Sequence, residues 1–200
     1  MNNLDRIFTS DPIEFARSYI SYVQSVLQRI DPEEIGRFIQ TLLEAREHGS
    51  SIFFIGNGGS AATASHFAND LSIGTNEYEK PFRAMSLTDN VPVITALGND
   101  FGYEDIFVRQ LQILGKSGDV VIGISASGNS LNLLKAFEYA RSAAIKTVAI
   151  TAFDGGKMKA MADEGVHVVT GPKEYGPAED AHMVLDHLVG AYLMRYVRQA

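Results

Sequence analysis

The 200-residue chain contains neither cysteine nor tryptophan. The absence of cysteine excludes a disulfide scaffold, a thiolate zinc site, an iron–sulfur cluster and a cysteine nucleophile. A chain without disulfides suits a reducing compartment such as the cytoplasm.

Long apolar runs are missing as well. The longest, such as IFFIG at residues 52–56 and VVIGI at residues 120–124, have the length of strands and are far too short to span a bilayer. The first 15 residues lack the basic start and apolar stretch of a secretory leader. We therefore expect a cytoplasmic protein without a membrane partner.

Positive charge is in short supply, because 17 lysine and arginine residues stand against 24 aspartate and glutamate residues, for a formal net charge of -7. Such a balance disfavours nucleic acid as a partner, since binding to phosphates requires lysine and arginine. The hydrophobic share of 46% and the charged share of 20% are ordinary for a globular chain. The length predicts one domain over residues 1–200.

The N-terminal quarter of the chain has helical periodicity. Residues 12–48 read as two helices, each preceded by an Asp-Pro pair, at Asp11-Pro12 and Asp31-Pro32. We interpret residues 1–49 as a helical hairpin and residues 50–200 as an α/β core with a C-terminal helix. The first helix has a wide apolar surface, which fits either contact with another subunit or ordinary core packing.

From residue 51 onward, short apolar runs alternate with helical patterns. The runs predict strands at residues 51–56, 82–87, 119–125, 147–152 and 166–170. The intervening patterns predict helices at residues 60–72, 91–97, 104–114, 130–143, 156–162 and 177–198. This alternation favours an α/β fold: an open, mostly parallel five-stranded sheet with helices on both faces.

Two strand-to-helix junctions carry glycine and hydroxyl residues, GNGGS at residues 56–60 and SASGNS at residues 125–130. Helix N-termini favour anions, and glycine lets the backbone approach a ligand. Either junction alone fits ordinary turn and cap chemistry, but the pair after two buried strands favours an anion site. Neither matches the P-loop or the dinucleotide fingerprint, so we expect no nucleotide cofactor.

Four runs, GNGGSAATASHFANDL, LGNDFGYEDIF, GISASGNS and DGGKM, occur in this order along the chain. Together they resemble the SIS (sugar isomerase) family and, within it, the phosphoheptose isomerases. The resemblance covers nearly the whole chain and implies an SIS fold. It also implies an isomerase that interconverts sedoheptulose 7-phosphate and D-glycero-D-manno-heptose 7-phosphate, as a heptose precursor of lipopolysaccharide or capsule. Members are typically cytoplasmic homotetramers with sites between subunits, and some carry zinc.

The resemblance also assigns roles to individual residues. It implies acid/base catalysis by Asp70 and His187, with Ser60, Ser125, Ser127 and Ser130 on the phosphate. The residues implied in substrate binding are Asn57, Gly58, Gly59, Ser60, Asn99, Asp100, Ser125, Ala126, Ser127, Ser130 and Glu179. The residues implied in zinc binding are His66, Asp70, Glu179 and His187.

The residue types suit the chemistry. Interconverting a ketose and an aldose through an enediol needs one group for a carbon-bound proton and another for the protons on oxygen, and a carboxylate and a histidine serve well. His66 and Asp70 are four residues apart and therefore share a helix face, although exposed pairs of this kind often only stabilise a helix. Glu179 and His187 lie eight residues, about 12 Å, apart on one helix, which argues against one ion between them within one copy.

Three departures from the family pattern keep other functions open. Asp70 stands where the family has glutamate, Glu179 stands where it has glutamine, and residues 171–176 lack an aspartate. One alternative is a non-catalytic SIS protein that binds a sugar phosphate or associates with a replication initiator. Another is a different aldose–ketose isomerisation. His182 and Asp186, also four residues apart, form a rival pair on the last helix.

Overall fold

The computed structural model describes residues 2–199, in which five parallel strands form one sheet in the order β2-β1-β3-β4-β5. The strands are β1 (Ser51–Gly56), β2 (Arg83–Ser86), β3 (Val120–Ser125), β4 (Lys146–Thr151) and β5 (Glu164–His167). The predicted α/β fold is therefore confirmed, and every neighbouring pair of strands is parallel.

The chain reverses its direction across the sheet between β1 and β3. After β1 it adds β2 on one side, and then returns to add β3 on the other. Gly56 at the end of β1 pairs with Ile124 near the end of β3, so residues 56–60 and 125–130 leave the sheet side by side. Ligands of open α/β sheets bind at such a switch point, outside the carboxyl ends of the strands.

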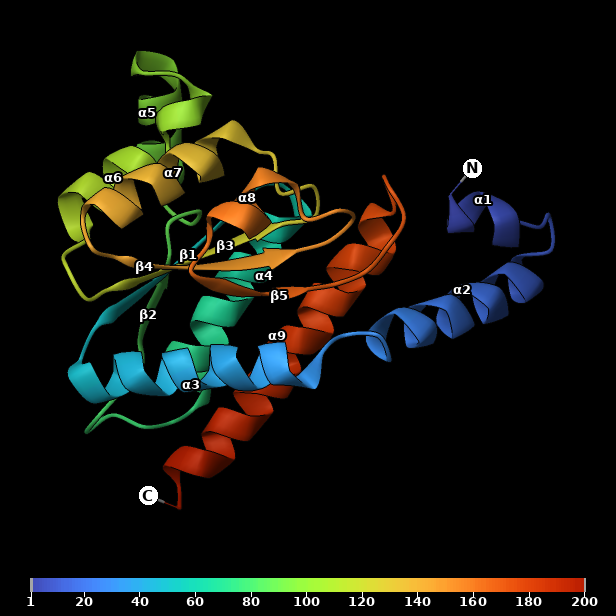
Figure 1. Ribbon diagram of the computed structural model, residues 1–200, viewed down its shortest axis with the longest axis horizontal. Coiled ribbons are helices and arrows are strands. Elements are labelled where there is room, and N and C mark those ends of the chain that lie inside the picture. Colours follow the sequence, from blue (N-terminus) through green and yellow to red (C-terminus); the bar gives the residue numbers. More distant parts are fainter. Residues whose placement is uncertain (1, 200) are drawn as a thin grey trace.

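Helices cover both faces of the sheet (Figure 1). They are α1 (Asn3–Ile7), α2 (Pro12–Leu27), α3 (Pro32–His48), α4 (Gly59–Asn69), α5 (Val91–Asp100), α6 (Val108–Leu114), α7 (Leu131–Ser142), α8 (Gly156–Met161) and α9 (Tyr175–Val197). On one face, Ile52 and Phe54 of β1 share a core with α3, α4 and α9. On the other, Phe53 and Ile55 pack with α6, α7 and α8. This alternation follows from the two-residue period of a strand.

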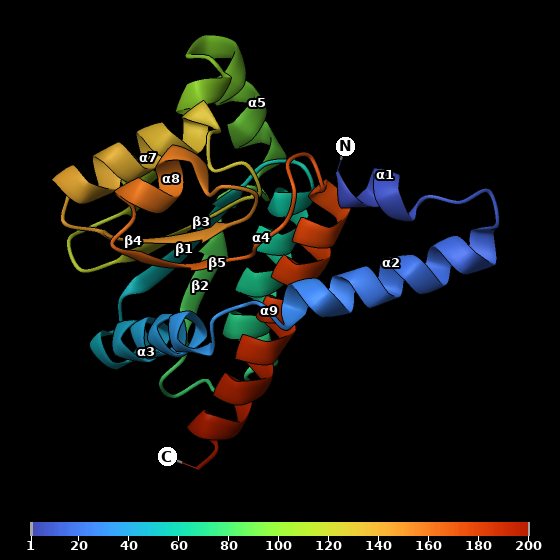
Figure 2. The same ribbon diagram turned by 45° about the vertical axis from the view of Figure 1, so that its right-hand side comes forward.

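The N-terminal helices begin where the Asp-Pro pairs predicted. The carboxylates of Asp11 and Asp31 each accept a hydrogen bond from the backbone N–H two residues later, at 2.9 Å. The hairpin interpretation of residues 1–49 is wrong in its geometry, because α2 packs on α9 whereas α3 packs on β5. Figures 1 and 2 show α2 projecting from the body instead of folding back along α3.

Two further segments differ from the prediction. Asn90 caps α5, which continues to Asp100, so Asn99 and Asp100 lie in its last turn and not in a loop. The helix predicted at residues 104–114 is divided into a 3-10 turn, Tyr103–Asp105, and α6. Gly102 separates α5 from this turn with a φ of 99°, a conformation that non-glycine residues avoid.

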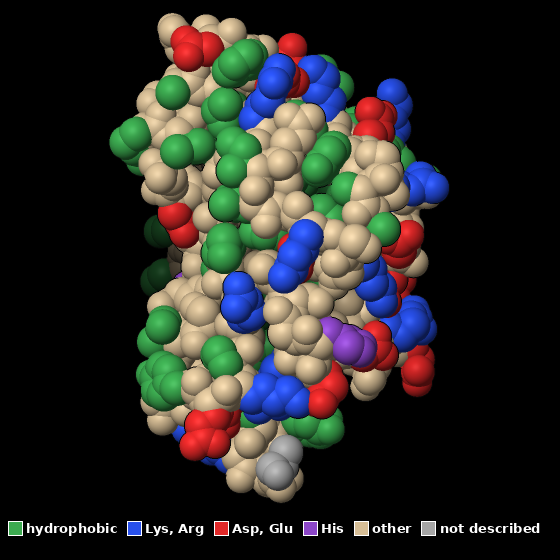
Figure 3. All heavy atoms as spheres, turned by 90° about the vertical axis from the view of Figure 1, so that its left-hand side faces the viewer, with side chains coloured by type: hydrophobic (Ala, Val, Ile, Leu, Met, Phe, Trp, Pro, Cys, Tyr) green, Lys and Arg blue, Asp and Glu red, His purple; other side chains and the backbone are tan. Residues whose placement is uncertain are grey.

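Charge on the surface is mixed. On the face shown in Figure 3, lysine and arginine side chains alternate with acidic and apolar ones and do not gather into one basic patch. Although α9 is long, neither it nor another helix within residues 2–199 combines the length and apolarity needed to cross a membrane.

His182 belongs to the core of α9 and is 1% exposed. Its Nε2 lies 3.4 Å from the carbonyl oxygen of Thr151 on β4, so it does not form the rival pair with Asp186. Burial lowers the pKa of His182 to about 4 from its ordinary 6.5. The imidazole is therefore neutral in the folded chain at pH 7.

This shift predicts a pH dependence of stability. The unfolded chain binds a proton at His182 near pH 6.5, whereas the folded chain binds it only near pH 4. Stability is therefore lost as the pH falls from 6.5 towards 4, by roughly 3 kcal/mol at most. His182→Gln, which stays neutral, should lose less stability than the wild type between pH 7 and pH 4.5 in urea unfolding. The exposed His48→Gln variant is the control, and equal losses in all three proteins would contradict the prediction.

Candidate functional site

A small pocket of about 140 Å³ lies at the carboxyl ends of β1 and β3, at the switch point of the sheet. We call it the serine pocket. Its lining residues are Asn57, Ser60, Ile124, Ser125, Ala126, Ser127, Ser130, Tyr175 and Glu179. The two glycine and hydroxyl junctions predicted from the sequence thus meet in one hollow.

Two helix N-termini point into this region without a side-chain cap. Gly58 precedes α4, Ser130 precedes α7, and neither makes a capping hydrogen bond through its side chain. The first N–H groups of both helices are therefore free to bind an anion. The serine loop keeps its shape because the Ser125 Oγ accepts a hydrogen bond from the Gly128 N–H at 3.1 Å. Gly128 has a φ of 61°.

The amide of Asn57 is held in place by two residues that the sequence analysis did not identify. Its Nδ2 donates to the side-chain oxygen of Asn132 at 2.9 Å, and its Oδ1 accepts from the Tyr103 hydroxyl at 2.8 Å. Asn132 lies in the first turn of α7, and Tyr103 begins the 3-10 turn that follows α5. These contacts orient Asn57 at the rim of the serine pocket.

Glu179 lies in the serine pocket. Its carboxylate sits directly over Gly59, where even a methyl group would overlap it. Burial raises the pKa of Glu179, and the charge of Asp180 raises it further. A carboxylate at this position opposes the binding of a second anion when it is ionised and ceases to do so when it is protonated.

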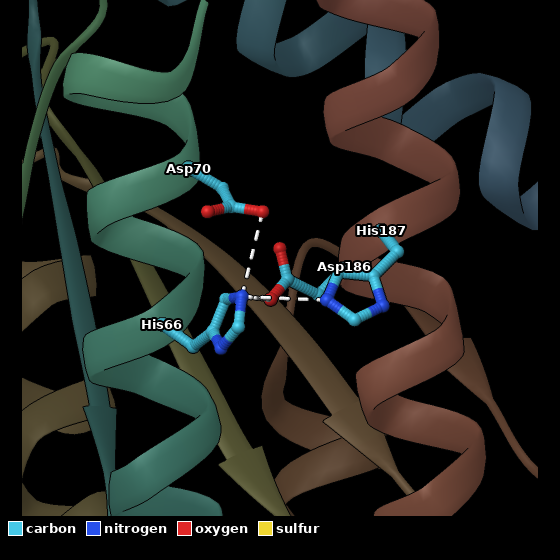
Figure 4. A group of neighbouring side chains, drawn as sticks. All are labelled: His66, Asp70, Asp186 and His187. Carbon is cyan, nitrogen blue, oxygen red and sulfur yellow. Dashed lines mark hydrogen bonds and ion pairs between the residues drawn. The ribbon is translucent and has the colours of Figure 1, made fainter.

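A second group of polar side chains lies beyond the serine pocket, where α4 packs against α9. The two helices run in parallel, so that Gly59 faces Glu179 and His66 faces His187. Asp70, which begins the π-helix Asp70–Gly74 directly after α4, faces Gly190. This register brings together His66, Asp70, Asp186 and His187, which we call the His–Asp cluster (Figure 4).

His66 is the centre of the cluster. Its Nε2 lies 3.3 Å from the Nε2 of His187, 3.5 Å from an oxygen of Asp70 and 3.9 Å from an oxygen of Asp186. The pair of His66 and Asp70 expected from their four-residue spacing is therefore present. His66 and His187 are exposed, whereas the side chain of Asp186 is fully buried.

Asp186 is the residue of the cluster that the sequence analysis did not place there. Burial raises the pKa of Asp186 to about 7, and the nearby charge of Asp70 contributes. Neither carboxylate oxygen has a hydrogen-bond partner within residues 2–199. The sequence does contain the signal, an acid next to His187, but assigning it needs the register of α9 on α4.

The donors of the cluster suit a divalent metal. One atom from each residue falls within 4.8 Å of the other three. Zinc with ligands at about 2.0–2.1 Å in a tetrahedron holds them about 3.3 Å apart, close to the 3.3 and 3.5 Å separations observed around His66. Glu179 is not a member of this set and lies with the serines.

Asn99 and Asp100 lie apart from both groups. The Asn99 amide donates to the carboxylate of Asp100 at 2.8 Å, and both side chains are exposed at the end of α5. Neither residue lines the serine pocket. Helix α5 has no buried residue of its own within this chain. These two side chains therefore reach a substrate only if another copy or a movement brings them to it.

Comparisons with known proteins find relatives that align with most of the chain. The family model described as the SIS domain matches residues 18–152. The phosphoheptose isomerase of Helicobacter pylori strain ATCC 700392 / 26695 is 39% identical over 158 residues, which are 78% of this chain and 81% of that protein. That of Aneurinibacillus thermoaerophilus is 36% identical over 184 residues, or 89% and 91% of the two chains. The solved phosphoheptose isomerase of Neisseria gonorrhoeae superimposes with a TM-score of 0.80 at 30% identity, covering 90% of this chain and 97% of that one.

The position of Glu179 predicts how the serine pocket responds to charge. Sulfate is a suitable probe because it remains a dianion across the accessible pH range. At pH 8 ionised Glu179 repels it, so Glu179→Gln should bind sulfate roughly tenfold more tightly than the wild type. The difference should shrink as the pH falls, because burial raises the pKa of Glu179 and protonation removes the charge that repels sulfate.

Isothermal titration calorimetry measures this difference. The control is Glu138→Gln, which removes an exposed carboxylate of α7 that lies outside the pocket. Equal sulfate affinity of Glu179→Gln and the wild type at pH 8 would show that Glu179 does not face the bound anion.

Proposed function

The chain belongs to the SIS domain family, and from that premise we propose that it is a phosphoheptose isomerase, which interconverts sedoheptulose 7-phosphate and D-glycero-D-manno-heptose 7-phosphate. Relatives with that activity in their names align with most of the chain. The observation that carries the proposal is that the serine pocket and the His–Asp cluster both lie along the contact between α4 and α9.

The serine pocket would hold the phosphate. Ser60, Ser125, Ser127 and Ser130 supply hydroxyl groups, and the first turns of α4 and α7 supply N–H groups. Asn57, fixed by Asn132 and Tyr103, would bind a sugar hydroxyl at the rim. Glu179, protonated or hydrogen-bonded to the sugar, would take the place of the family's glutamine.

The spacing between the serine pocket and the His–Asp cluster fits a heptose. Ser60 and His66 are six residues apart on α4, a rise of about 9 Å. The seven carbons of a heptose are joined by six bonds. An extended polypeptide spans about 3.3–3.6 Å for every three backbone bonds, so six bonds span about 7 Å. A sugar with its phosphate among the serines would therefore present carbons 1 and 2 to the His–Asp cluster.

We assign the proton transfers to Asp70 and His187. Asp70 would take the proton from carbon 1 of the ketose and return it to carbon 2, while His187 moves protons between the oxygens on these carbons. The enediol is the intermediate, and no electrons leave the sugar. His66, in contact with both residues, would orient them.

The chemistry of the donors also supports a zinc ion on His66, Asp70 and His187, each through one donor atom. The second carboxylate oxygen of Asp70 and the second ring nitrogen of His187 would then remain for proton transfer. When bound, zinc would polarise a sugar oxygen as a Lewis acid. The sequence expectation adds Glu179, which lies in the serine pocket of the same chain. A Glu179 ligand would thus have to come from another copy.

We further propose a cytoplasmic homotetramer that supplies heptose for surface glycans, with sites completed between subunits. Several apolar side chains on the projecting α2 and on α9 face solvent in the single chain. Ile13 and Ile20 on α2 are 63% and 68% exposed, and Leu188 and Tyr192 on α9 are 44% and 47% exposed. Further copies would cover these surfaces and carry Asn99 and Asp100 of α5 to a site. Light scattering of the purified chain measures the oligomeric state directly.

Incubation with sedoheptulose 7-phosphate, followed by chromatographic separation of the sugars, tests the activity. We expect an aldose product. His187→Ala should lower kcat by about 10²–10⁴-fold because it removes an acid/base group. Ser127→Ala should chiefly raise KM, since it removes a ligand of the phosphate. The exposed residues His48 and Ser142, changed to alanine, provide matched controls with wild-type rates.

Absence of product above the level of the Ser127→Ala, His187→Ala double variant would contradict an isomerase. Tight binding of the sugar phosphate without turnover would instead favour the non-catalytic alternative, a role that the shorter acid at Asp70 would fit.

A further inference from the structure

The carboxylate of Asp186 has no part in the proton transfers described above, yet it lies in the same cluster as Asp70 and His187. We infer that Asp186 is the fourth protein ligand of a divalent metal centre formed with His66, Asp70 and His187, in the role that the resemblance implies for Glu179. The inference rests on the proposed function for the expectation of a metal, and on this chain's own geometry for the identity of the ligand.

The first argument is distance. Three donor atoms surround the Nε2 of His66, at 3.3 Å for His187, 3.5 Å for Asp70 and 3.9 Å for Asp186. Ligands of tetrahedral zinc are about 3.3 Å apart. Figure 4 shows the side chains of α4 and α9 converging on one small volume, with Asp186 contributing from α9 together with His187.

The second argument is burial. The Asp186 side chain is fully buried, and both oxygens are without a hydrogen-bond partner within residues 2–199. A buried carboxylate that lacks partners destabilises the folded state. A divalent cation would satisfy an oxygen of Asp186 directly. With two aspartates and two neutral histidines, the net charge of the centre would be zero.

The third argument concerns Glu179, which cannot serve in this chain. It precedes Asp186 by seven residues on α9, about 10 Å along the helix. Its carboxylate is packed over Gly59 among the serines. Since Asp186 approaches from the core side, the exposed side of the centre would remain open to a sugar oxygen, and zinc accommodates a fifth ligand during reactions.

Metal binding by the full chain tests this assignment without reference to activity. Protein stripped with a chelator would be titrated with Zn²⁺ against a chromophoric competitor, and with Co²⁺ while its visible absorption is recorded. Asp186→Asn should weaken Zn²⁺ binding by about 100-fold or more, since even residues that only support a ligand contribute 10–100-fold. Glu179→Gln and the distant Glu138→Gln should both stay within about threefold of the wild type.

Folding of the variant is checked separately. Metal-free Asp186→Asn should unfold at the same temperature as the metal-free wild type or a higher one, because the buried charge is gone, while its stabilisation by added Zn²⁺ should be lost. If Asp186→Asn fails to fold, X-ray absorption of zinc in the wild type decides instead. Two imidazole nitrogens and two carboxylate oxygens, together with undiminished Zn²⁺ binding by Glu179→Gln, support the assignment.

Three results would overturn it: no metal binding by the wild type, wild-type affinity in Asp186→Asn, or a loss in Glu179→Gln as large as that expected for Asp186→Asn. Failure of the proposed function is distinct. A chain that binds Zn²⁺ through Asp186 but converts no sugar phosphate would retain this metal centre and lose the isomerase assignment.

Discussion

The parallel packing of α4 on α9 is the constraint on which the rest of the site depends. Gly59 faces Glu179 and Asp70 faces Gly190, and the two residues of each pair are 120 positions apart in the sequence. The two helices therefore keep one register along their whole contact. Gly59 leaves room for the carboxylate of Glu179, and a methyl group at Gly190 would already lie 3.8 Å from Asp70. Because α4 starts at the switch point of the sheet, the same register joins the serine pocket to the His–Asp cluster.

An excess of acid distinguishes the contact between α4 and α9. Asp70, Asp186 and Glu179 are all carboxylates, and burial raises the pKa of the last two. Because these carboxylates repel a phosphate, its binding depends on the N–H groups of α4 and α7. A cation would stabilise the His–Asp cluster by neutralising its carboxylates. The shorter side chain of Asp70 also changes the demands on its surroundings, because a displacement of about 1 Å at a catalytic group can cost about 100-fold in rate. Asp186 places a second carboxylate near His66, at 3.9 Å.

Much of the fold could be predicted from the sequence, because its causes are local. The buried strands are short apolar runs, the two Asp-Pro pairs start α2 and α3, and the two glycine and hydroxyl junctions follow β1 and β3. An Asp-Pro pair determines where a helix begins but not the direction of the helix before it. The predicted hairpin of α2 and α3 was therefore wrong. Asp186 and Asn132 come near His66 and Asn57 only through packing between distant segments. Periodicity within one helix does not contain that information.

The central claim is that one sugar phosphate extends from the serine pocket to the His–Asp cluster. A crystal structure of the His187→Ala variant with sedoheptulose 7-phosphate tests it most directly. The account predicts the phosphate on the hydroxyls of Ser60, Ser125 and Ser127, and carbons 1 and 2 beside the carboxylate of Asp70. A phosphate bound elsewhere, or a sugar chain that leaves the serine pocket away from α4 and α9, would contradict it.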